Sequence, residues 1–518
     1  MLYICIMFAR KKRNRSGSIS VVVVNKRHGK FVEVKNFGTV HSEEDAHALY
    51  LKAKSWIVSN GGQLSLDFGN KCGRERDETE RVVSNISSLL INGTQILLNH
   101  IYDSIGFHVL GDDVLRHLVV ARVSQPGSKL ATVEYLKSYY DEDVDLNRIY
   151  RYMDRLYNTQ KEKVQSISVE HTRRLFGGRL GLLFYDVSTL YFESAVDDGF
   201  RSPGFSKDGK TAETQVVLGL LVSEGGYPLS YSLYNGKQYE GYTMVPMIDD
   251  FKQRFCLSDD FVVVADSGLM NRKNVSLLRQ AGYKYIIGAR IKNEDTCVRE
   301  WILGLQLADG EYAECQASEG ERLVVGYSRK RAEKDAYNRK RGVDRLRKAY
   351  KNGKLTKSQV NRRGYNKFLE ISKDINVEIS EEKIKEDAYW DGLKGYITNT
   401  LLSQEQVVNQ YHGLWVVERA FRVSKGTLEM RPMFHFTPRR IEAHVCICFV
   451  AYKVYKELER IIRQLKIPLS VGKVLDIAKT IITVSINMPE NGDIMRKTMF
   501  LTPRQQMVKP LFDMFLNE

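Results

Sequence analysis

Apolar and polar positions alternate along the start of the chain and predict a small mixed unit. Residues 18–40, SISVVVVNKRHGKFVEVKNFGTV, contain two β-branched runs around a basic turn, which is typical of a hairpin. Ser42 then begins a stretch with Ala and Leu at helical spacing, as expected of a capped helix. We therefore expect an αβ unit over residues 1–75. Residues 76–175 follow as helical segments separated by short Gly or Pro breaks, and they predict a mainly helical N-terminal region.

From residue 181 the pattern changes to strands. GLLFYDVSTLYFES and FVVVADSGLM are apolar runs typical of strands buried on both faces, and they carry Asp186 and Asp266 at or near their ends. Two further strands lie between these runs, followed by a helix, and another helix and strand come after them. The order β, β, β, α, β, α, β describes an α/β ribonuclease H-like (retroviral integrase-like) fold, in which the first and fourth strands are neighbours.

This fold is interrupted after Arg290 and resumes near residue 401. Residues 329–367 hold sixteen Lys or Arg against three Asp or Glu, a density that suits phosphate contacts or a solvated helical hairpin. We therefore expect a catalytic domain in two parts, an insertion domain with a basic segment, and a C-terminal helical unit without an assigned role. Their ranges are 176–290 and 401–465 for the catalytic domain, 291–400 for the insertion and 466–518 for the C-terminal unit.

Overall charge and cysteine usage narrow the class of protein. The chain has 78 Lys and Arg against 63 Asp and Glu, a net charge of +15, which favours a polyanionic partner such as nucleic acid. A basic protein without such a partner is the alternative. The seven cysteines include no CxxC pair, which argues against a zinc cluster or disulfide framework and fits a cytoplasmic protein. No apolar run has the length of a membrane span.

The stretch Tyr411–Lys425, YHGLWVVERAFRVSK, predicts a helix with one carboxylate, Glu418, among aromatic and cationic side chains. Asp186 and Asp266 should lie close together at adjacent strand ends, where their charges repel unless a cation neutralises them. Oxygen ligands without Cys or His select Mg²⁺, with Mn²⁺ as a substitute. Two such ions about 4 Å apart promote phosphodiester cleavage. A strand-end cap is the alternative role for either aspartate.

These residues and motifs carry a resemblance. FYDVSTLYFES, VVVADSGL, GYITNT, the Tyr411–Lys425 helix and RPMFHF resemble a DDE insertion-sequence transposase, of the branch marked by the signature Y-x2-R-x3-E-x6-K. The resemblance implies that Asp186, Asp266 and Glu418 are catalytic and bind two Mg²⁺ ions. It also implies phosphate contacts for the signature Tyr and Lys, here Tyr411 and Lys425.

One position departs from the signature, because Leu414 stands where the family has Arg. Our hypothesis is that Arg422, one helical turn past the glutamate, supplies the missing cation. Lys207 and Lys210, in the loop after the first strand, and Arg431, past the catalytic helix, are further candidates for DNA contacts.

The resemblance implies a DNA transposase that binds the inverted ends of its element and catalyses metal-dependent strand cleavage and strand transfer. Two ends must be held together, so we expect a homodimer on DNA and no membrane partner. An RNase H-like nuclease without strand transfer and a DNA-binding transposase relative remain alternatives. The helices of residues 76–175 suit either binding of the DNA ends or a scaffold.

Overall fold

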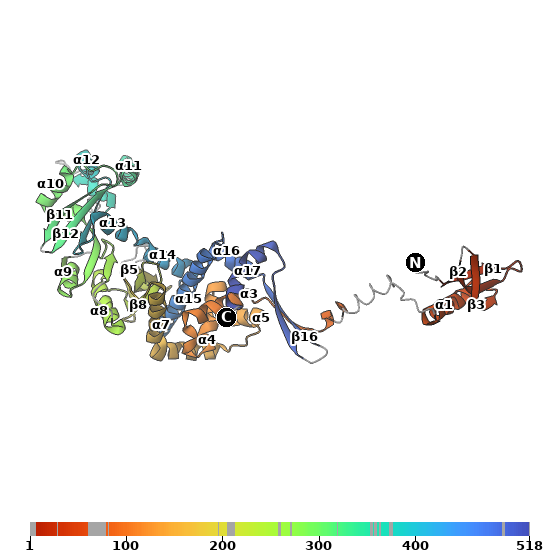
Figure 1. Ribbon diagram of the computed structural model, residues 1–518. Helices are drawn as coiled ribbons and strands as arrows, with labels where there is room; N and C mark the ends of the chain where they lie inside the picture. The colour runs from red at the N-terminus through yellow and green to blue at the C-terminus, as the bar shows by residue number, and fades with distance from the viewer. Residues whose placement is uncertain are drawn as a thin grey trace. The chain divides into compact units, whose positions relative to one another are not determined.

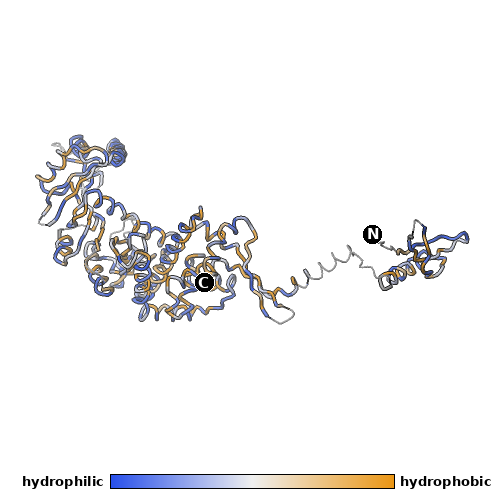
Figure 2. The backbone as a smooth tube through the Cα atoms, viewed as in Figure 1, coloured by the Kyte–Doolittle hydropathy of each residue, from blue (hydrophilic) through white to orange (hydrophobic). Residues whose placement is uncertain are grey.

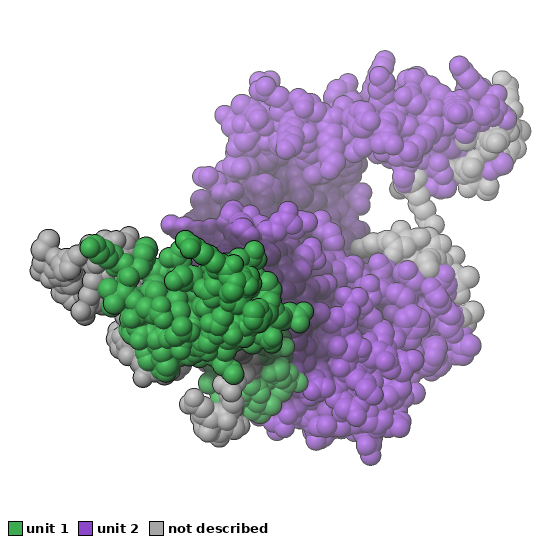
Figure 3. Space-filling model, turned by 90° about the vertical axis from the view of Figure 1, so that its right-hand side faces the viewer, with its two compact units in different colours: residues 1–87, 486–495 green, residues 88–485, 496–518 purple. Residues whose placement is uncertain are grey.

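The computed structural model describes residues 7–516 apart from 28–29, 61–78, 81, 195, 205–212, 257–260, 270–271, 319, 353–355, 357–359, 362–363, 372–376 and 489–492. The chain divides into two compact units (Figure 3). One unit comprises residues 1–87 and 486–495, and the other comprises residues 88–485 and 496–518.

The N-terminal unit contains an antiparallel sheet of three strands covered on one face by a helix. The strands are β1 (Met7–Arg13), β2 (Ile19–Arg27) and β3 (Lys30–Val40), with β2 in the middle, and the helix is α1 (Glu43–Asn60). Alternate residues of β2 pack on the helix because successive side chains in a strand point to opposite faces. The predicted hairpin and the helix after it are both confirmed.

Helices follow in the second unit, and most begin at a side-chain cap. Asp112, Ser128 and Asp145 each accept a hydrogen bond from a backbone N–H in the first turn of the next helix. The elements are α3 (Gly93–Ile105), η1 (Phe107–Leu110), α4 (Asp113–Ser124), α5 (Lys129–Tyr140), α6 (Leu146–Arg155), the π-helix η2 (Leu156–Gln160) and α7 (Lys161–Leu175).

These helices share one hydrophobic core with the long helix α15 (Pro438–Gln464), against which α3, α4, α6 and α7 pack. Such packing is what the scaffold alternative expects, and a role in binding DNA ends stays a prediction. The residues that precede them differ from the expected helix, because β4 (Ile86–Leu90) is a strand. It pairs with β16 (Ile482–Asn487), far along the chain.

The second unit contains a mixed sheet, beside which the helices of its other part lie (Figure 1). Its first strands are β5 (Leu182–Tyr191), β6 (Ser202–Pro203), β7 (Thr214–Ser223), β8 (Pro228–Asn235), β9 (Val262–Ala265) and β10 (Lys284–Ala289). β5 pairs antiparallel with β7 and parallel with β9, and β9 pairs parallel with β10. The first and fourth long strands are therefore neighbours, which confirms the ribonuclease H-like fold.

Strands of the interval 291–400 extend this same sheet. β11 (Tyr312–Ser318) pairs with β12 (Glu321–Tyr327), and β15 (Leu393–Thr398) lies between β12 and β10. The basic segment forms α11 (Arg329–Lys351), which is predominantly blue in the hydropathy colouring of Figure 2. The remaining elements of the interval are η4 (Ile291–Asn293), α10 (Thr296–Gly304), η6 (Gly364–Phe368), β13 (Leu369–Ile371), β14 (Val377–Ile379) and α12 (Glu381–Ala388).

The two faces of the sheet have separate cores. Phe184, Val264 and Tyr396 point to the face covered by α13 (Gln404–His412), α14 (Trp415–Arg422) and α15. The residues that alternate with them along the strands, such as Tyr185 and Val263, point to the other face. That face is covered by η3 (Glu240–Tyr242), α8 (Met244–Phe255), α9 (Arg272–Gln280) and α10. This alternation decides on which side each polar strand residue lies.

The sequence pattern predicted a helical C-terminal segment, but the structure contains two strands there as well. Between α16 (Val471–Ala478) and α17 (Pro503–Leu516) lie the strands β16 and β17 (Ile494–Met499), which complete the small sheet with β4. Over the residues that the structure describes, none of the helices has the length and apolar character needed to cross a membrane.

Candidate active site

Asp186 and Asp266 occupy matching positions on neighbouring parallel strands. Tyr185 of β5 is paired with Ala265, the last residue of β9, and each aspartate is the next residue of the chain. Asp266 thus follows the end of its strand, whereas Asp186 lies in the middle of β5 and not at its end as expected. Asp186 therefore points to the same face of the sheet as Phe184, and Asp266 to the same face as Val264. The strand pairing confirms the expected adjacency of the two positions. Asp186 is partly buried, and Asp266 is more exposed.

Several donors hold Asp266 in its charged form. The Tyr411 hydroxyl, on α13, donates a 2.8 Å hydrogen bond to Oδ1 of this aspartate. Burial is the largest single effect and acts to raise the pKa of Asp266, whereas the Tyr411 hydroxyl and the backbone N–H of Ser267 act to lower it. The ammonium of Lys394 and the N–H of Gly268 add to this effect. The resulting pKa of Asp266 lies below its ordinary value, so the carboxylate is ready to accept a cation.

Lys394 of β15 is a polar member of the site that the sequence analysis missed. It precedes Tyr396 by two residues, so it lies on the same face of the sheet, and its ammonium stands 4.2 Å from the ring centroid of Tyr411. Burial lowers the pKa of Lys394, whereas the carboxylates of Asp266 and Glu418 act to raise it. One cation thus interacts with both acids. A single Lys at the start of an apolar strand was the sequence feature that could have revealed it.

Glu418 lies in the first turn of α14, where it is exposed. The predicted single helix is interrupted, because α13 ends at His412 and α14 begins at Trp415. A Cβ on Gly413 would stand 2.6 Å from the Phe184 ring, so glycine permits the close approach of this junction to β5. Leu414, at the position of the signature Arg, is 6% exposed and belongs to the core.

Lys425 follows α14 in the π-helix η7 (Val423–Thr427) and reaches the strand that carries Asp186. Its ammonium donates to the Thr189 carbonyl at 2.9 Å and to the Ser188 hydroxyl. Ser188 lies two residues past Asp186, on the same face of β5. The lysine therefore fixes the segment after α14 beside the part of β5 that carries Asp186.

The other predicted DNA contacts lie in different surroundings. Arg422 is exposed at the end of α14. The Arg431 guanidinium lies 4.9 Å from the ring centroid of Tyr191, at the end of β5. Lys207 and Lys210 lie outside the described residues. Tyr411 is 3% exposed and its hydroxyl is engaged with Asp266, so its phosphate contact and those of the other residues stay predictions.

The chemistry of this site suits a hard divalent cation. Asp186, Asp266 and Glu418 offer only oxygen atoms, which are the ligands that Mg²⁺ and Mn²⁺ prefer. Across the described part of the chain, no three His, Cys, Asp or Glu side chains stand close enough together to form a ready-made metal site. The strand pairing sets the positions of the two aspartates side by side, and the charges of Asp266 and Glu418 act on the ammonium of Lys394.

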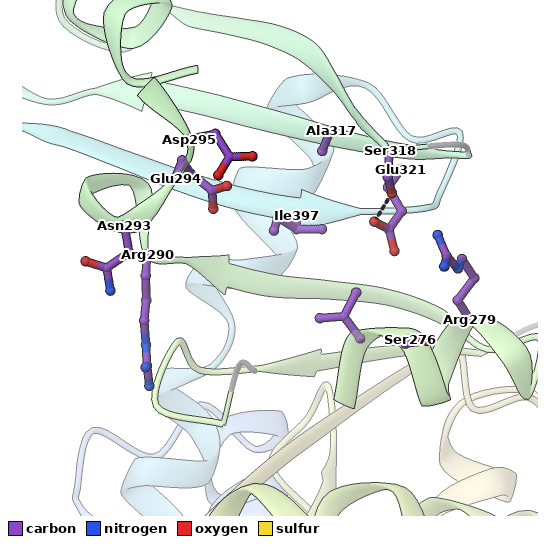
Figure 4. A pocket seen from close by; sticks show the side chains of 11 residues that line it. Ser276, Arg279, Arg290, Asn293, Glu294, Asp295, Ala317, Ser318, Glu321 and Ile397 are labelled. Atoms are coloured by element: carbon purple, nitrogen blue, oxygen red, sulfur yellow. Dashed lines mark hydrogen bonds between the residues drawn. The ribbon is translucent and has the colours of Figure 1, made fainter. Parts of the chain in front are cut away.

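A pocket of about 430 Å³ lies on the opposite face of the sheet (Figure 4). Arg279 and Arg290 are among the residues that line it, and Ser318 donates a hydrogen bond to Glu321 at its wall. Arg290 also donates to the carbonyls of Ser267 at 3.0 Å and Gly268 at 3.2 Å. This arginine therefore stabilises the turn after Asp266 through two hydrogen bonds to its backbone.

Comparison with known proteins gives the family. The model of the transposase DDE domain matches residues 177–453, more than half of the chain, and the chain belongs to this family of DNA transposases. No curated protein matches it.

Among solved structures, a piggyBac transposase synaptic complex with hairpin DNA is similar over 80% of this chain and 70% of that chain, at 9% identity and a TM-score of 0.38. A Mos1 transposase paired-end complex is similar over 34% of this chain and 58% of that chain, at 11% identity and a TM-score of 0.16. A pre-cleavage Mos1 transpososome covers the same shares at 10% identity and the same TM-score.

Proposed function

We propose that Asp186, Asp266 and Glu418 are the catalytic acids of this transposase. With them the protein cuts DNA at the inverted ends of its element and joins the freed ends to new DNA. The observation that carries this proposal is the pairing of β5 with β9, which sets Asp186 beside Asp266. The charges of Asp266 and Glu418 both act on the ammonium of Lys394, which supports Glu418 as the third acid.

Each residue has a distinct role in this mechanism. Asp186, Asp266 and Glu418 would hold two Mg²⁺ ions, for which Mn²⁺ would substitute. When bound, the ions supply activation of the nucleophile and stabilisation of the leaving oxygen. Tyr411 orients the Asp266 carboxylate through its hydrogen bond. Lys425 positions the segment after α14 against β5.

Phosphate contacts come from the basic residues around these acids. Arg422, exposed one turn after Glu418, takes the role of the signature Arg, because Leu414 is part of the core. Lys425, Arg431, Lys207 and Lys210 are the further contacts. Helix α11 adds a basic surface, since exposed Lys and Arg lie along most of its length.

A donor plasmid that carries the coding sequence with its natural flanks tests the proposal. With Mg²⁺, the wild-type chain should release the element and produce joined products, and Asp186→Asn, Asp266→Asn and Glu418→Gln should each abolish cleavage. Glu405→Gln, an exposed acid on α13, is the matched control and should cleave normally. Cleavage without joining would favour a nuclease, and cleavage by Asp186→Asn would refute the assignment.

The role of Arg422 is tested in the same assay. Arg422→Ala should cut the ends more slowly because one phosphate contact is lost, whereas Lys473→Ala, which removes an exposed cation on α16, should not. Normal end cleavage by Arg422→Ala would remove Arg422 from the site.

A homodimer on DNA is expected, since two ends must be cut together. The mass of the complex with DNA measures this oligomeric state.

A further inference from the structure

The N-terminal sheet has a basic face that lies outside the family domain. Residues 7–40 contain nine Lys or Arg and one Glu, whereas α1 begins with three consecutive acids. The matched transposase domain begins at residue 177, so this unit needs a role of its own. Its charge is divided between the strands and the helix, which indicates that one side of the unit meets a polyanion.

Strand parity separates the basic residues of β1 into two sets. Lys11 and Arg13 point toward α1, where both bond Glu43, at 3.1 and 3.0 Å. Arg10 and Lys12 point the other way, because they pair with Val22 and Ser20 rather than with the core residues of β2. Both are exposed on the face opposite the helix.

Aromatic side chains accompany these cations on the outer face. Phe31 of β3 is 52% exposed, and its ring meets that of Phe8 edge to face with centroids 5.7 Å apart. The Arg10 guanidinium lies 5.9 Å from the Phe31 ring centroid. A guanidinium beside an aromatic ring gains a cation–π contact and keeps five N–H groups that can donate to phosphate. Such a surface suits a phosphate backbone with adjacent sugars and bases.

We propose that the outer face of the β1–β2–β3 sheet binds duplex DNA, with Arg10 and Lys12 on backbone phosphates and Phe31 packed beside them. The inference deepens the proposed function, on which its choice of partner depends. Its physical basis is charge complementarity, since each cation that neutralises a phosphate releases counterions. Twisted antiparallel strands are also able to enter a DNA groove.

Edge protection is the competing explanation for these residues. β1 and β3 are the edge strands of the sheet, and charged residues on edge strands prevent chains from pairing with one another. That explanation predicts that removal of the charges causes self-association and leaves DNA affinity unchanged. The two explanations therefore differ in what a charge-removing variant does.

The test uses the full chain in EDTA, with a random-sequence DNA duplex followed by fluorescence anisotropy over a range of salt. Arg10→Gln/Lys12→Gln should bind more weakly by on the order of 60-fold at about 0.1 M salt, and its slope of log affinity against log salt should fall by about 2. In each single variant the slope should fall by about half as much as in the double variant. Lys52→Gln/Lys54→Gln removes the same charge from exposed positions of α1 and should bind as the wild type does.

Three results would overturn the inference: unchanged affinity and slope in Arg10→Gln/Lys12→Gln, equal losses in both double variants, or self-association with unchanged DNA affinity. Circular dichroism and the oligomeric mass confirm the state of each variant. End cleavage in Mg²⁺ separates this inference from the proposed function. If Arg10→Gln/Lys12→Gln cleaves normally and binds DNA as the wild type does, only the role of the sheet in DNA binding is refuted. Cleavage by Asp186→Asn refutes the catalytic assignment, whatever the result for the sheet.

Discussion

Removal of one hydroxyl group, in Tyr411→Phe, tests how the site holds its second aspartate. The Tyr411 hydroxyl donates to Asp266 at 2.8 Å, and burial together with this carboxylate raises the pKa of the tyrosine, so the group stays a protonated donor. A hydrogen bond to a charged group contributes about 1.5–3 kcal/mol. At about 1.4 kcal/mol for each factor of ten, its loss corresponds to about 10- to 100-fold.

We therefore expect Tyr411→Phe to reduce Mg²⁺-dependent end cleavage by about 10- to 100-fold, the range typical of partners that orient a metal ligand. The hydroxyl helps to lower the pKa of Asp266, so its removal should raise that pKa. Because an aspartate loses its charge as the pH falls through its pKa, the acid limb of the pH–rate profile should move to higher pH.

The assay is the rate of end cleavage over a range of Mg²⁺ concentration and pH. Tyr396→Phe is the control, because it makes the same change in the ring that packs edge to face on Tyr411, with centroids 4.7 Å apart. The control should cleave within a few-fold of the wild type. A Tyr411→Phe variant with the wild-type rate and the wild-type pH profile would show that Asp266 does not depend on this hydrogen bond.

Three further substitutions test other contacts. A Cβ in Gly288→Ala would stand 2.5 Å from the Tyr411 hydroxyl, so we expect slower cleavage, as for Tyr411→Phe, and normal cleavage would contradict this expectation. Lys425→Met removes the bond to the Thr189 carbonyl and should lower stability by about 1–3 kcal/mol in urea titrations, a prediction that an unchanged midpoint refutes. Burial lowers the pKa of Lys129 to about 7, so the unfolded chain binds an extra proton between about pH 7 and 10 and stability should rise with pH there by up to about 1.4 kcal/mol per unit. Lys129→Met should remove this rise, and an unchanged pH dependence of the urea midpoint would count against it.

The order of the central strands could be predicted from the sequence because each strand has a strong local pattern. Long apolar runs such as the one that contains Asp186 and the one that precedes Asp266 are buried on both faces, and the known rules of strand connection then leave few topologies. The same reasoning predicted the hairpin of β2 and β3, where β-branched residues surround a basic turn. The neighbouring positions of the two aspartates were therefore accessible from local information.

The sequence by itself thus determined the central strands β5, β7, β8, β9 and β10, their order, and the neighbouring positions of Asp186 and Asp266. Only the tertiary structure decided the partners of those acids, because Tyr411 and Asp266 are 145 residues apart and no local periodicity relates them. The same holds for Lys394, whose side of the sheet follows from the pairing of β15 with β10. It also holds for the interruption of the catalytic helix at Gly413, where close packing on Phe184 outweighs the helical pattern of the segment. Contacts between distant segments depend on how whole elements pack, which their individual patterns do not contain.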